Sequence, residues 1–383
     1  MLHSFRLDTS KLPPALETLR EEVRDFIESE RREGSFTIGP GGWQRYDRSL
    51  SMKIGAKGWI GMTWPKRYGG HERSAMERYV VTEELLAAGM PLRAHWVGDR
   101  QIGPNLLKFG TEEQKSSILP RIARGELSFC VGLSEPDSGS DLASIRSRAI
   151  EVDGGWRVQG TKIWQSIAHK AEYMTLFVRT SPLGENKHEG ISQFLVDMTS
   201  PGISVRPIIN LVGEHDFNEV HFEDVFVPDS AVIGTIGNGW NQVSGELAYE
   251  RSGADRWFGT FDVFAAGVDR TAEGAENECA IGRLAAQFWT LHRMSLGIAQ
   301  MLEEGVTPNV EAALVKDLAT NFDQEIPAVL RQVVPADARA RLPEDDPFPA
   351  MLDHALKFAP ALTIKGGTKE ILRGIIARGL GLR

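Results

Sequence analysis

The most informative stretch of this chain reads Leu133-Ser134-Glu135-Pro136-Asp137-Ser138-Gly139-Ser140-Asp141, and Trp164-Gln165-Ser166 follows it downstream. Its small hydroxyl side chains, proline-fixed turn and glycine let the backbone approach a flat polar ring closely. The downstream indole can cover one face of such a ring. A surface loop without a ligand can have the same composition, so the meaning of the stretch depends on the rest of the chain.

The composition is that of a globular protein. With 383 residues, 42% of them hydrophobic and 25% charged, the chain can bury a sizeable core and hold two or three domains. The net charge of −9 and the absence of a polybasic run argue against a nucleic-acid partner. No apolar run approaches the roughly 18 residues of a membrane span, and residues 1–10 contain no secretory signal. We therefore expect a cytoplasmic protein without a membrane span.

The cysteines and histidines give no sign of a metal centre. Cys130 and Cys279 have neither CxxC nor zinc spacing and fit a reduced compartment, and we expect both to fill the core. The nine histidines do not pair at metal-ligand spacing, so the sequence predicts no metal site.

The N-terminal part of the chain is predicted to be helical. From Pro13 to about Arg124, apolar residues recur at intervals of three and four. Within this part, Thr111-Glu112-Glu113-Gln114 predicts a capping box that opens a helix after Gly110 has ended the previous one.

Short runs of β-branched and aromatic residues then predict a small β domain or barrel. The expected strands are 127–133, 147–152, 156–159, 173–178, 193–198, 203–208 and 218–222. Helical periodicity returns at about Trp240, with further long helices from about Asn277, Asn309 and Thr368 and a charged, proline-bearing loop over 335–349.

These patterns together predict an α+β fold rather than a doubly wound sheet. The expected parts are an N-terminal helical domain (1–125), a central β domain (126–232) and a C-terminal helical bundle (233–383).

Four motifs occur in order along the chain. They are Ser134 to Asp141, Gly160 to Ser166, Gly237-Asn238-Gly239-Trp240 with Leu247 and Glu250-Arg251, and Gly367 to Arg373. The set resembles the motifs of the acyl-CoA dehydrogenases, a flavoprotein family with this same order of helical, β-barrel and helical domains, and the resemblance covers nearly the whole chain. It implies FAD as the cofactor and an acyl-CoA thioester as the substrate.

The resemblance also implies roles for the residues around the flavin. Ser134 would bind the pyrimidine edge of the ring together with backbone groups of Val131 and Leu133, and Ser166 would bind near the reactive N5. Trp164 would pack beside the isoalloxazine, and the alternative is that its indole fills the protein core.

Further residues are assigned by the same resemblance. Ser140 would meet the pantetheine or phosphate part of CoA, with a simple turn role as the alternative. Leu247 and Arg251 would contact the substrate. Thr368 and Glu370 would belong to the cofactor site, with Glu370 nearer the ADP half of FAD.

The implied reaction removes an α-proton from the acyl-CoA while a β-hydride moves to flavin N5, which gives a trans-2-enoyl-CoA. A desolvated carboxylate must take the proton. Most family members place it directly before the C-terminal Gly-Thr, where this chain has Gly366. A minority place it on a helix directly before an arginine, which matches Glu250, so we predict Glu250 as the base. Glu246 and Glu370 are weaker candidates, and a surface ion pair is the alternative role of Glu250.

Two family motifs, R-x-x-F-G and Q-x-x-G-G-x-G, reach across a subunit interface to the FAD pyrophosphate and adenine, and both are missing at their expected places. Arg256-Trp257-Phe258-Gly259 has similar letters but falls on the base helix. The pattern resembles the heteromeric acyl-CoA dehydrogenases of bacterial steroid side-chain degradation, in which two different chains share each FAD site. We therefore expect a second acyl-CoA-dehydrogenase-like subunit in an α2β2 heterotetramer. In the alternative homotetramer, Arg283 or Arg293 replaces the missing arginine.

The resemblance favours a steroid or other bulky, branched acyl-CoA, because the base lies on a helix and Gly366 removes bulk. An electron-transfer flavoprotein is the expected electron acceptor. An acyl-CoA oxidase is the rival enzyme, although those chains are usually much longer. The non-enzyme rival is a catalytically silent partner subunit that completes the FAD site of another chain. Gly366 favours this rival, whereas Ser134, Trp164, Ser166 and Glu250 together argue against it.

Overall fold

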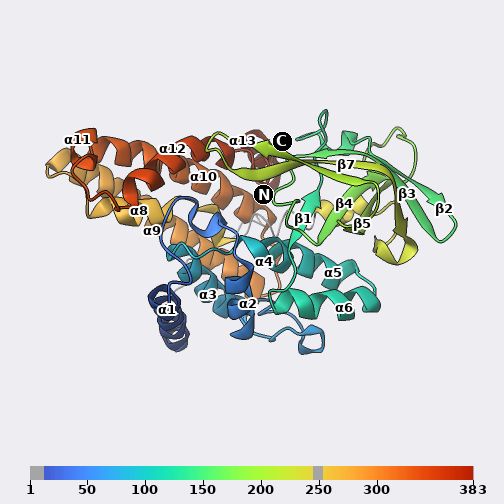
Figure 1. The fold of residues 1–383 in the computed structure, drawn as a ribbon, viewed down its shortest axis with the longest axis horizontal. Helices are drawn as coiled ribbons and strands as arrows, with labels where there is room; N and C mark the ends of the chain where they lie inside the picture. Colours follow the sequence, from blue (N-terminus) through green and yellow to red (C-terminus); the bar gives the residue numbers. More distant parts are fainter. Residues whose placement is uncertain (1–12, 245–252, 383) are drawn as a thin grey trace. The chain divides into compact units, whose positions relative to one another are not determined.

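The computed structural model describes residues 13–244 and 253–382. Their contacts form two compact units, one of residues 13–50, 73–93 and 253–382 and the other of residues 51–72 and 94–244. Figure 1 shows the elements of both units. The N-terminal helical segment therefore contributes to both, and α2 (Arg48–Ala56) and α4 (Arg93–Val97) each contain a point where the chain passes between them.

The first unit is helical. Its helices are α1 (Glu17–Arg32), α3 (Ala75–Ala87), α8 (Phe261–Val268), α9 (Ala275–Glu303), α10 (Asn309–Val333), α11 (Ala336–Arg339), α12 (Phe348–Leu362) and α13 (Lys369–Gly379). Short 3₁₀ turns are η1 (Pro14–Leu16), η2 (Gly42–Gln44) and η7 (Ala254–Arg256).

Helix α10 is central to this unit because it packs against α8, α9, α12 and α13 (Figure 1). Buried residues recur along α10 at intervals of three and four, as a helix with one core face requires. They include Ala312, Val315, Ala319, Phe322, Ile326 and Leu330. Helix α3 joins the N-terminal segment to this core through contacts with α1 and α9.

The second unit is built on an eight-stranded sheet with the strand order β6-β7-β3-β2-β4-β5-β8, and β1 pairs with β4. The strands are β1 (Phe129–Gly132), β2 (Arg148–Val152), β3 (Gly155–Ile163), β4 (Tyr173–Arg179), β5 (Ile191–Asp197), β6 (Ile203–Ile209), β7 (His215–Pro228) and β8 (Val232–Ile233). The pairings of β4 with β1 and with β2 are parallel, and the others are antiparallel.

The helical residues 239–244 follow the sheet in the sequence, but most helical elements of this unit precede it. They are η3 (Lys66–Tyr68), the π-helical turn η4 (Gly98–Ile102), α5 (Gly103–Phe109) and α6 (Glu112–Ala123), and the 3₁₀ turns η5 (Leu142–Ser144) and η6 (Asp229–Ala231) follow. Strand β3 shows how the sheet acquires its core, because Trp156 and Val158 are buried whereas Arg157 and Gln159 are exposed. The indole of Trp156 packs edge-on against Phe194 at a centroid distance of 5.7 Å.

The predicted fold class is confirmed: a helical N-terminal segment, a β domain and a C-terminal helical segment follow one another. Each of the seven expected strands is present, and β7 extends well beyond 218–222 because it pairs with both β3 and β6. No described helix is long and apolar enough to cross a membrane.

Two sequence expectations are wrong in detail. The predicted loop 335–349 contains the short helix α11, and α12 begins at Phe348 before the loop was expected to end. Cys130 is buried, but Cys279 is exposed because it lies in the polar first part of α9, where Glu276 and Glu278 also lie.

The capping box predicted at the start of α6 is present. Gln114 N–H donates to Thr111 Oγ1 at 3.2 Å, and Thr111 N–H donates to Gln114 Oε1 at 3.1 Å. The amide of Gln114 also donates to the carbonyls of Ser230 and Val232 at 2.8 and 2.9 Å. One buried side chain therefore both caps α6 and binds it to the end of the sheet.

We expect Gln114→Ala to destabilise the protein by about 1–3 kcal/mol, because a cap is lost and two carbonyls lose their donors. Urea unfolding followed by circular dichroism measures the change. The matched control is Glu113→Gln at the exposed neighbouring position, which should unfold at the urea concentration of the parent. Equal midpoints for all three proteins would contradict this role of Gln114.

Candidate functional site

The stretch of residues 133–141, which we call the signature loop, begins where β1 ends. Strand β1 lies parallel to β4, with Gly132 opposite Leu176. A Cβ on Gly132 would lie 2.5 Å from Met174 Sδ and 2.9 Å from Leu176 Cδ1, so a larger residue here would require these two side chains to move. Among the strands that the structure describes, β1 pairs with β4 alone. The half-buried Leu133 and Ser134 follow directly after its last residue.

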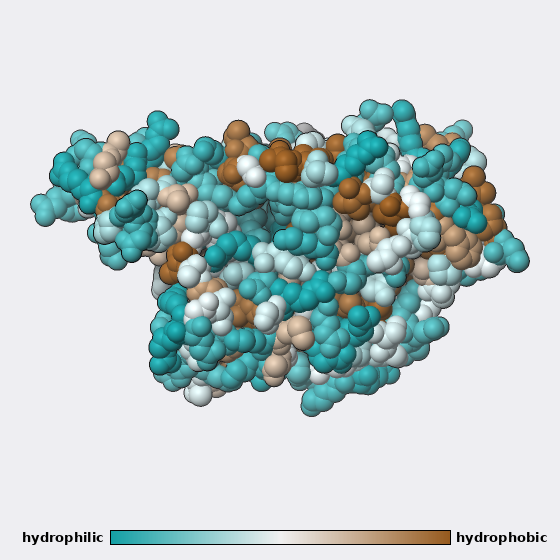
Figure 2. All heavy atoms as spheres, in the orientation of Figure 1, coloured by the Kyte–Doolittle hydropathy of each residue, from teal (hydrophilic) through white to brown (hydrophobic). Residues whose placement is uncertain are grey.

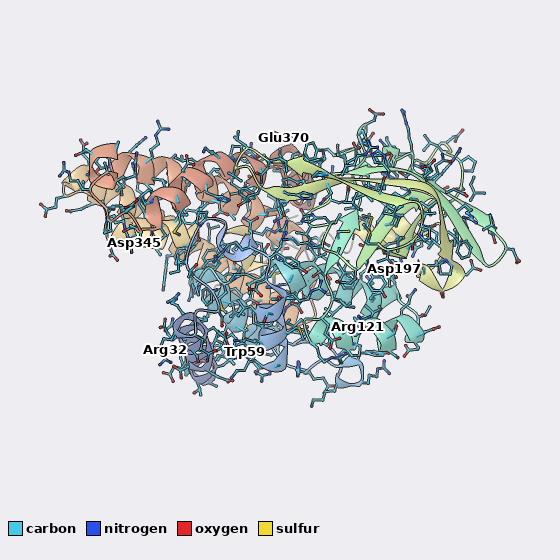
Figure 3. All side chains as sticks on the ribbon, viewed as in Figure 1. Arg32, Trp59, Arg121, Asp197, Asp345 and Glu370 are labelled. Atoms are coloured by element: carbon cyan, nitrogen blue, oxygen red, sulfur yellow. The ribbon has the colours of Figure 1, made fainter. Side chains whose placement is uncertain are left out.

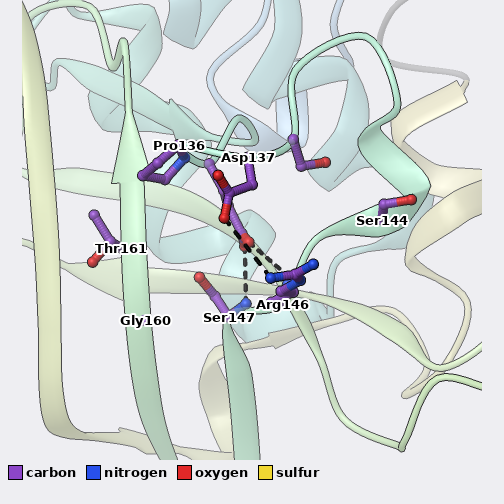
Figure 4. Close-up of a pocket in the computed structure, with 9 residues that line it drawn as sticks. Pro136, Asp137, Ser144, Arg146, Ser147, Gly160 and Thr161 are labelled. Carbon is purple, nitrogen blue, oxygen red and sulfur yellow. Dashed lines mark hydrogen bonds and ion pairs between the residues drawn. The ribbon is translucent and has the colours of Figure 1, made fainter.

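A buried ion pair holds this loop against β3. Lys162 Nζ lies 2.8 Å from Glu135 Oε1, and the side chain of Lys162 is 0% exposed. Lys162 Nζ also donates to the Leu133 carbonyl at 3.0 Å. Glu135 accepts further hydrogen bonds from the backbone N–H groups of Arg146 and Ser147 at 2.6 and 3.0 Å (Figure 4). The start of the loop is therefore bound to two other segments of the chain, β3 and residues 146–147.

The surroundings of the pair favour the charged form of Glu135. Burial opposes the charged form of Glu135, but the Lys162 ammonium and the hydrogen bonds outweigh it and lower the pKa of the carboxyl group. Burial lowers the pKa of Lys162 to about 8, against the opposing effect of Glu135. The sequence analysis quoted both residues within motifs but assigned neither a role. The strand expected at 156–159 stops short of Lys162, whereas β3 extends to Ile163, so the sequence pattern did not place this lysine in the sheet.

The tip of the loop is fixed by its own hydrogen bonds. Glu135 and Ser138 exchange backbone hydrogen bonds at 2.8 and 3.0 Å. Asp141 accepts from Lys187 Nζ at 2.6 Å and Ser144 Oγ at 2.5 Å, and these bonds lower its pKa. Ser140, expected to meet CoA, is exposed at this tip. Figure 4 shows the pocket beside the loop.

The second motif lies next to the first, because Ile163 N–H donates to the Ser134 carbonyl at 3.0 Å. Trp164 follows with φ of +69°, a conformation that costs about 1–3 kcal/mol for a residue other than glycine. Its side chain is 57% exposed. The indole packs edge-on against Phe217, with the ring centroids 6.1 Å apart. The alternative in which this indole fills the core is therefore excluded. Ser166, two residues later, is half-buried.

Thr368 and Glu370 lie in the helical unit. Thr368 is the N-cap of α13 and accepts from Ile371 N–H at 3.5 Å, and Glu370 is exposed in the first turn (Figure 3). Gly366 before them has φ of +72°, in the left-handed region, so a glutamate at this position would be strained. The buried Lys316 donates to the Gly367 carbonyl at 3.0 Å and fixes this turn.

Glu250, Leu247 and Arg251 lie outside the described residues, and so does Glu246. On one side of this segment, residues 239–244 are helical. On the other side, the expectation that Arg256-Trp257-Phe258-Gly259 continues the base helix is wrong. Arg256 ends the 3₁₀ turn η7, and bends follow at 259–260.

Buried side chains hold residues 257–260 in their non-helical conformation. Trp257 Nε1 donates to Ser295 Oγ at 2.8 Å, and the carboxylate of Asp323 accepts from the N–H groups of Gly259 and Thr260, each at 3.2 Å. Burial raises the pKa of Asp323 to about 7, although these donors oppose the shift. Arg283 and Arg293 both lie on α9, where Arg283 is exposed and Arg293 half-buried.

The described residues contain no group of three or more His, Cys, Asp or Glu side chains that could hold a metal ion. What the structure brings together in the β unit is the flavin-edge set that the sequence analysis expected: Val131, Leu133, Ser134, Trp164 and Ser166. The edge strand β1, the signature loop with its hydroxyl side chains and the exposed Trp164 form a surface suited to a flat, polar aromatic ring.

The fold and this site define the three-part architecture of an acyl-CoA dehydrogenase. Family models match most of the chain: the acyl-CoA dehydrogenase N-terminal domain over residues 13–126, the middle domain over 130–225 and the C-terminal domain over 237–381. The chain belongs to the acyl-CoA dehydrogenase family, whose members are flavin-dependent oxidoreductases.

Several relatives match this chain along nearly its whole length. Acyl-CoA dehydrogenase FadE26 of Mycobacterium tuberculosis is 31% identical over 96% of this chain and 97% of its own. Acyl-CoA dehydrogenase IpdE1 of the same organism is 32% identical over 96% and 98%.

Two solved structures are similar in fold. The "Tcur3481-Tcur3483 steroid ACAD" has a TM-score of 0.84 at 29% identity and covers 98% of both chains. The ChsE4-ChsE5 complex from Mycobacterium tuberculosis has a TM-score of 0.83 at 30% identity and covers 99% of this chain and 100% of the other.

A double-mutant cycle tests the buried pair. We expect Glu135→Gln to cost about 3–5 kcal/mol in unfolding free energy, because it leaves the Lys162 ammonium buried without its partner. Lys162→Met should also destabilise. The double variant should lose clearly less than the sum of the two, since both charges are then gone. Strict additivity in urea unfolding would show that the two charges do not depend on each other.

Proposed function

We propose that this chain catalyses the FAD-dependent α,β-dehydrogenation of an acyl-CoA thioester to the trans-2-enoyl-CoA. The observation that carries the proposal is the exposed Trp164, held in a left-handed conformation beside the pinned Ser134 loop. A strained backbone conformation that holds a large apolar side chain in solvent indicates a ligand-binding role.

The residues present fit a flavin. The loop after β1 offers hydroxyl and backbone groups, and the exposed indole of Trp164 offers an apolar face. In this proposal Ser134, with backbone groups of Val131 and Leu133, holds the pyrimidine edge, and Ser166 donates near N5. When bound, FAD supplies the acceptor for the hydride that leaves the substrate β-carbon.

The proton chemistry belongs to Glu250 in this proposal. Its carboxylate takes the proton from the substrate α-carbon, the electron pair of that C–H bond forms the new double bond, and the hydride leaves the β-carbon. The left-handed Gly366 supports a base elsewhere than before Gly-Thr, because a glutamate at 366 would be strained. Leu247 and Arg251 would contact the acyl-CoA near the base, and Ser140 would contact its CoA part.

We further propose a bulky, branched or steroid side-chain acyl group. The support is the small residue at 366 and the similarity to a solved structure whose title names a steroid ACAD. An electron-transfer flavoprotein would reoxidise the enzyme.

We also propose that a second acyl-CoA-dehydrogenase-like chain completes the FAD site in a heterotetramer. Similar solved structures carry titles that name two components, ChsE4-ChsE5 and Tcur3481-Tcur3483. Large apolar side chains are exposed on and next to the C-terminal helices, on an otherwise largely hydrophilic surface (Figure 2), which suits an association surface. They are Trp289, Leu318, Ile364 and Ile371. Thr368 and Glu370 would take part in this cofactor site.

We expect Glu250→Gln to retain flavin and to lower kcat by at least about 10²-fold, because an amide cannot accept the α-proton. Single-turnover flavin bleaching with a branched acyl-CoA measures the step. The matched control is Glu246→Gln, which should bleach at a rate near that of the parent. A Glu250→Gln rate near the parental rate would remove Glu250 from the mechanism, and an inactive parent with bound flavin would favour the silent-subunit role.

Expression of the chain alone and together with a neighbouring acyl-CoA-dehydrogenase-like gene product tests the partner. We expect bound flavin in the visible spectrum, and a tetrameric mass by light scattering, only on co-expression, because this chain lacks the motifs for the ADP end of FAD. A yellow homotetramer of this chain alone would overturn the partner proposal and leave the Glu250 chemistry standing.

A further inference from the structure

Asn218, on β7, is completely buried and uses both ends of its side-chain amide. Its Oδ1 accepts from His215 Nε2 at 2.7 Å and from His169 Nδ1 at 3.2 Å. Its Nδ2 donates to the Gln165 carbonyl at 2.8 Å. The two imidazole rings stack at a centroid distance of 3.7 Å and an angle of 17°. The two histidines therefore fix which way the amide faces.

The group that this amide binds is the segment between Trp164 and Ser166. Gln165 N–H donates to the Asn218 carbonyl at 3.1 Å, so both backbone groups of Gln165 bind one residue. A residue held at its N–H and its C=O cannot rotate about its backbone without breaking one of the two bonds.

Other residues at the start of β7 complete the support. Ile167 N–H donates to the Asp216 carbonyl at 2.8 Å, and Phe217 packs edge-on against Trp164. Trp164 and Ile167 both have positive φ, at +69° and +52°, so two strained residues flank Gln165 and Ser166. Such a conformation persists only where the surroundings impose it.

We propose that Asn218, oriented by His169 and His215, is a positioning residue that sets the direction of Trp164 and Ser166 toward the flavin. The inference rests on the proposed function, since the flavin is part of it. Asn218 touches no reacting group in this scheme. Its Nδ2 acts through backbone carbonyls, that of Gln165 at 2.8 Å and that of Asp216 at 3.5 Å. The loss of the amide would leave the sheet pairing of β7 with β6 and β3 in place and would free the segment that faces the cofactor.

Two variants test the proposal in the flavin-loaded enzyme. Asn218→Leu removes both ends of the amide, and the double variant His169→Phe/His215→Phe removes the donors to Oδ1 while keeping two stacked rings. We expect both to shift the absorption maximum and the reduction potential of the bound flavin. We also expect kcat to fall by about tenfold to a hundredfold with little change in KM, because the misplacement affects alignment rather than binding.

The control is His221→Gln. His221 lies on the same strand but contacts Thr161 and Glu219 rather than the segment from 164 to 167. The His221→Gln variant should leave the flavin spectrum, the reduction potential and kcat unchanged. If Asn218→Leu fails to fold, the double histidine variant carries the same test.

Hydrogen exchange on the flavin-free chain separates the inference from the function on which it rests. We expect the amides of Gln165 and Ile167 to exchange faster in both variants than in the parent and in His221→Gln. Faster exchange in a protein that never binds flavin would contradict the proposed function but support the positioning role of Asn218. Parental exchange rates, spectrum and kcat in well-folded variants would overturn the positioning role.

Discussion

The β unit depends on a charge pair taken out of water. Lys162 and Glu135 are both buried, and a buried charge is tolerated only when its partner and its hydrogen bonds are all in place. Glu135 also holds the N–H groups of Arg146 and Ser147, so the pair joins β3, the signature loop and the start of β2. Nothing apolar of similar size could bind those backbone groups. The conformation of the signature loop is therefore set by an electrostatic requirement rather than by packing alone.

The two segments of the candidate site are held in different ways, one without backbone strain and the other with it. The signature loop is held by ordinary, well-satisfied hydrogen bonds. The Trp164 segment, in contrast, is held in an unfavourable backbone conformation by β7. A strained segment is useful where a side chain must project from a sheet without packing on it. Here that side chain is an exposed indole, which gains contact area only when a ligand covers it.

Much of this was predictable from local patterns, and the remainder depended on contacts between distant residues. The strands followed from alternating residues and turn signals, and the Thr111 cap followed from four consecutive residues. The motif around Trp164 indicated a ligand-facing indole, which its exposure supports. The roles of Lys162 and Asn218 could not be predicted, because each depends on a partner 27 or 53 positions away whose register only the folded sheet defines. Gly259 and Thr260 are not helical for the same kind of reason, since Asp323 on the distant helix α10 binds both of their N–H groups.

The amide of Gln114 bears on where this chain can be cut. A fragment that began at residue 126, where helical periodicity gives way to strands, would contain the Ser230 and Val232 carbonyls without the helix that supplies their donors. The smallest autonomous piece of the β unit therefore has to include α6. In evolutionary terms, the sheet and this last N-terminal helix would be inherited or exchanged together, across a boundary that hydrophobic periodicity places between them.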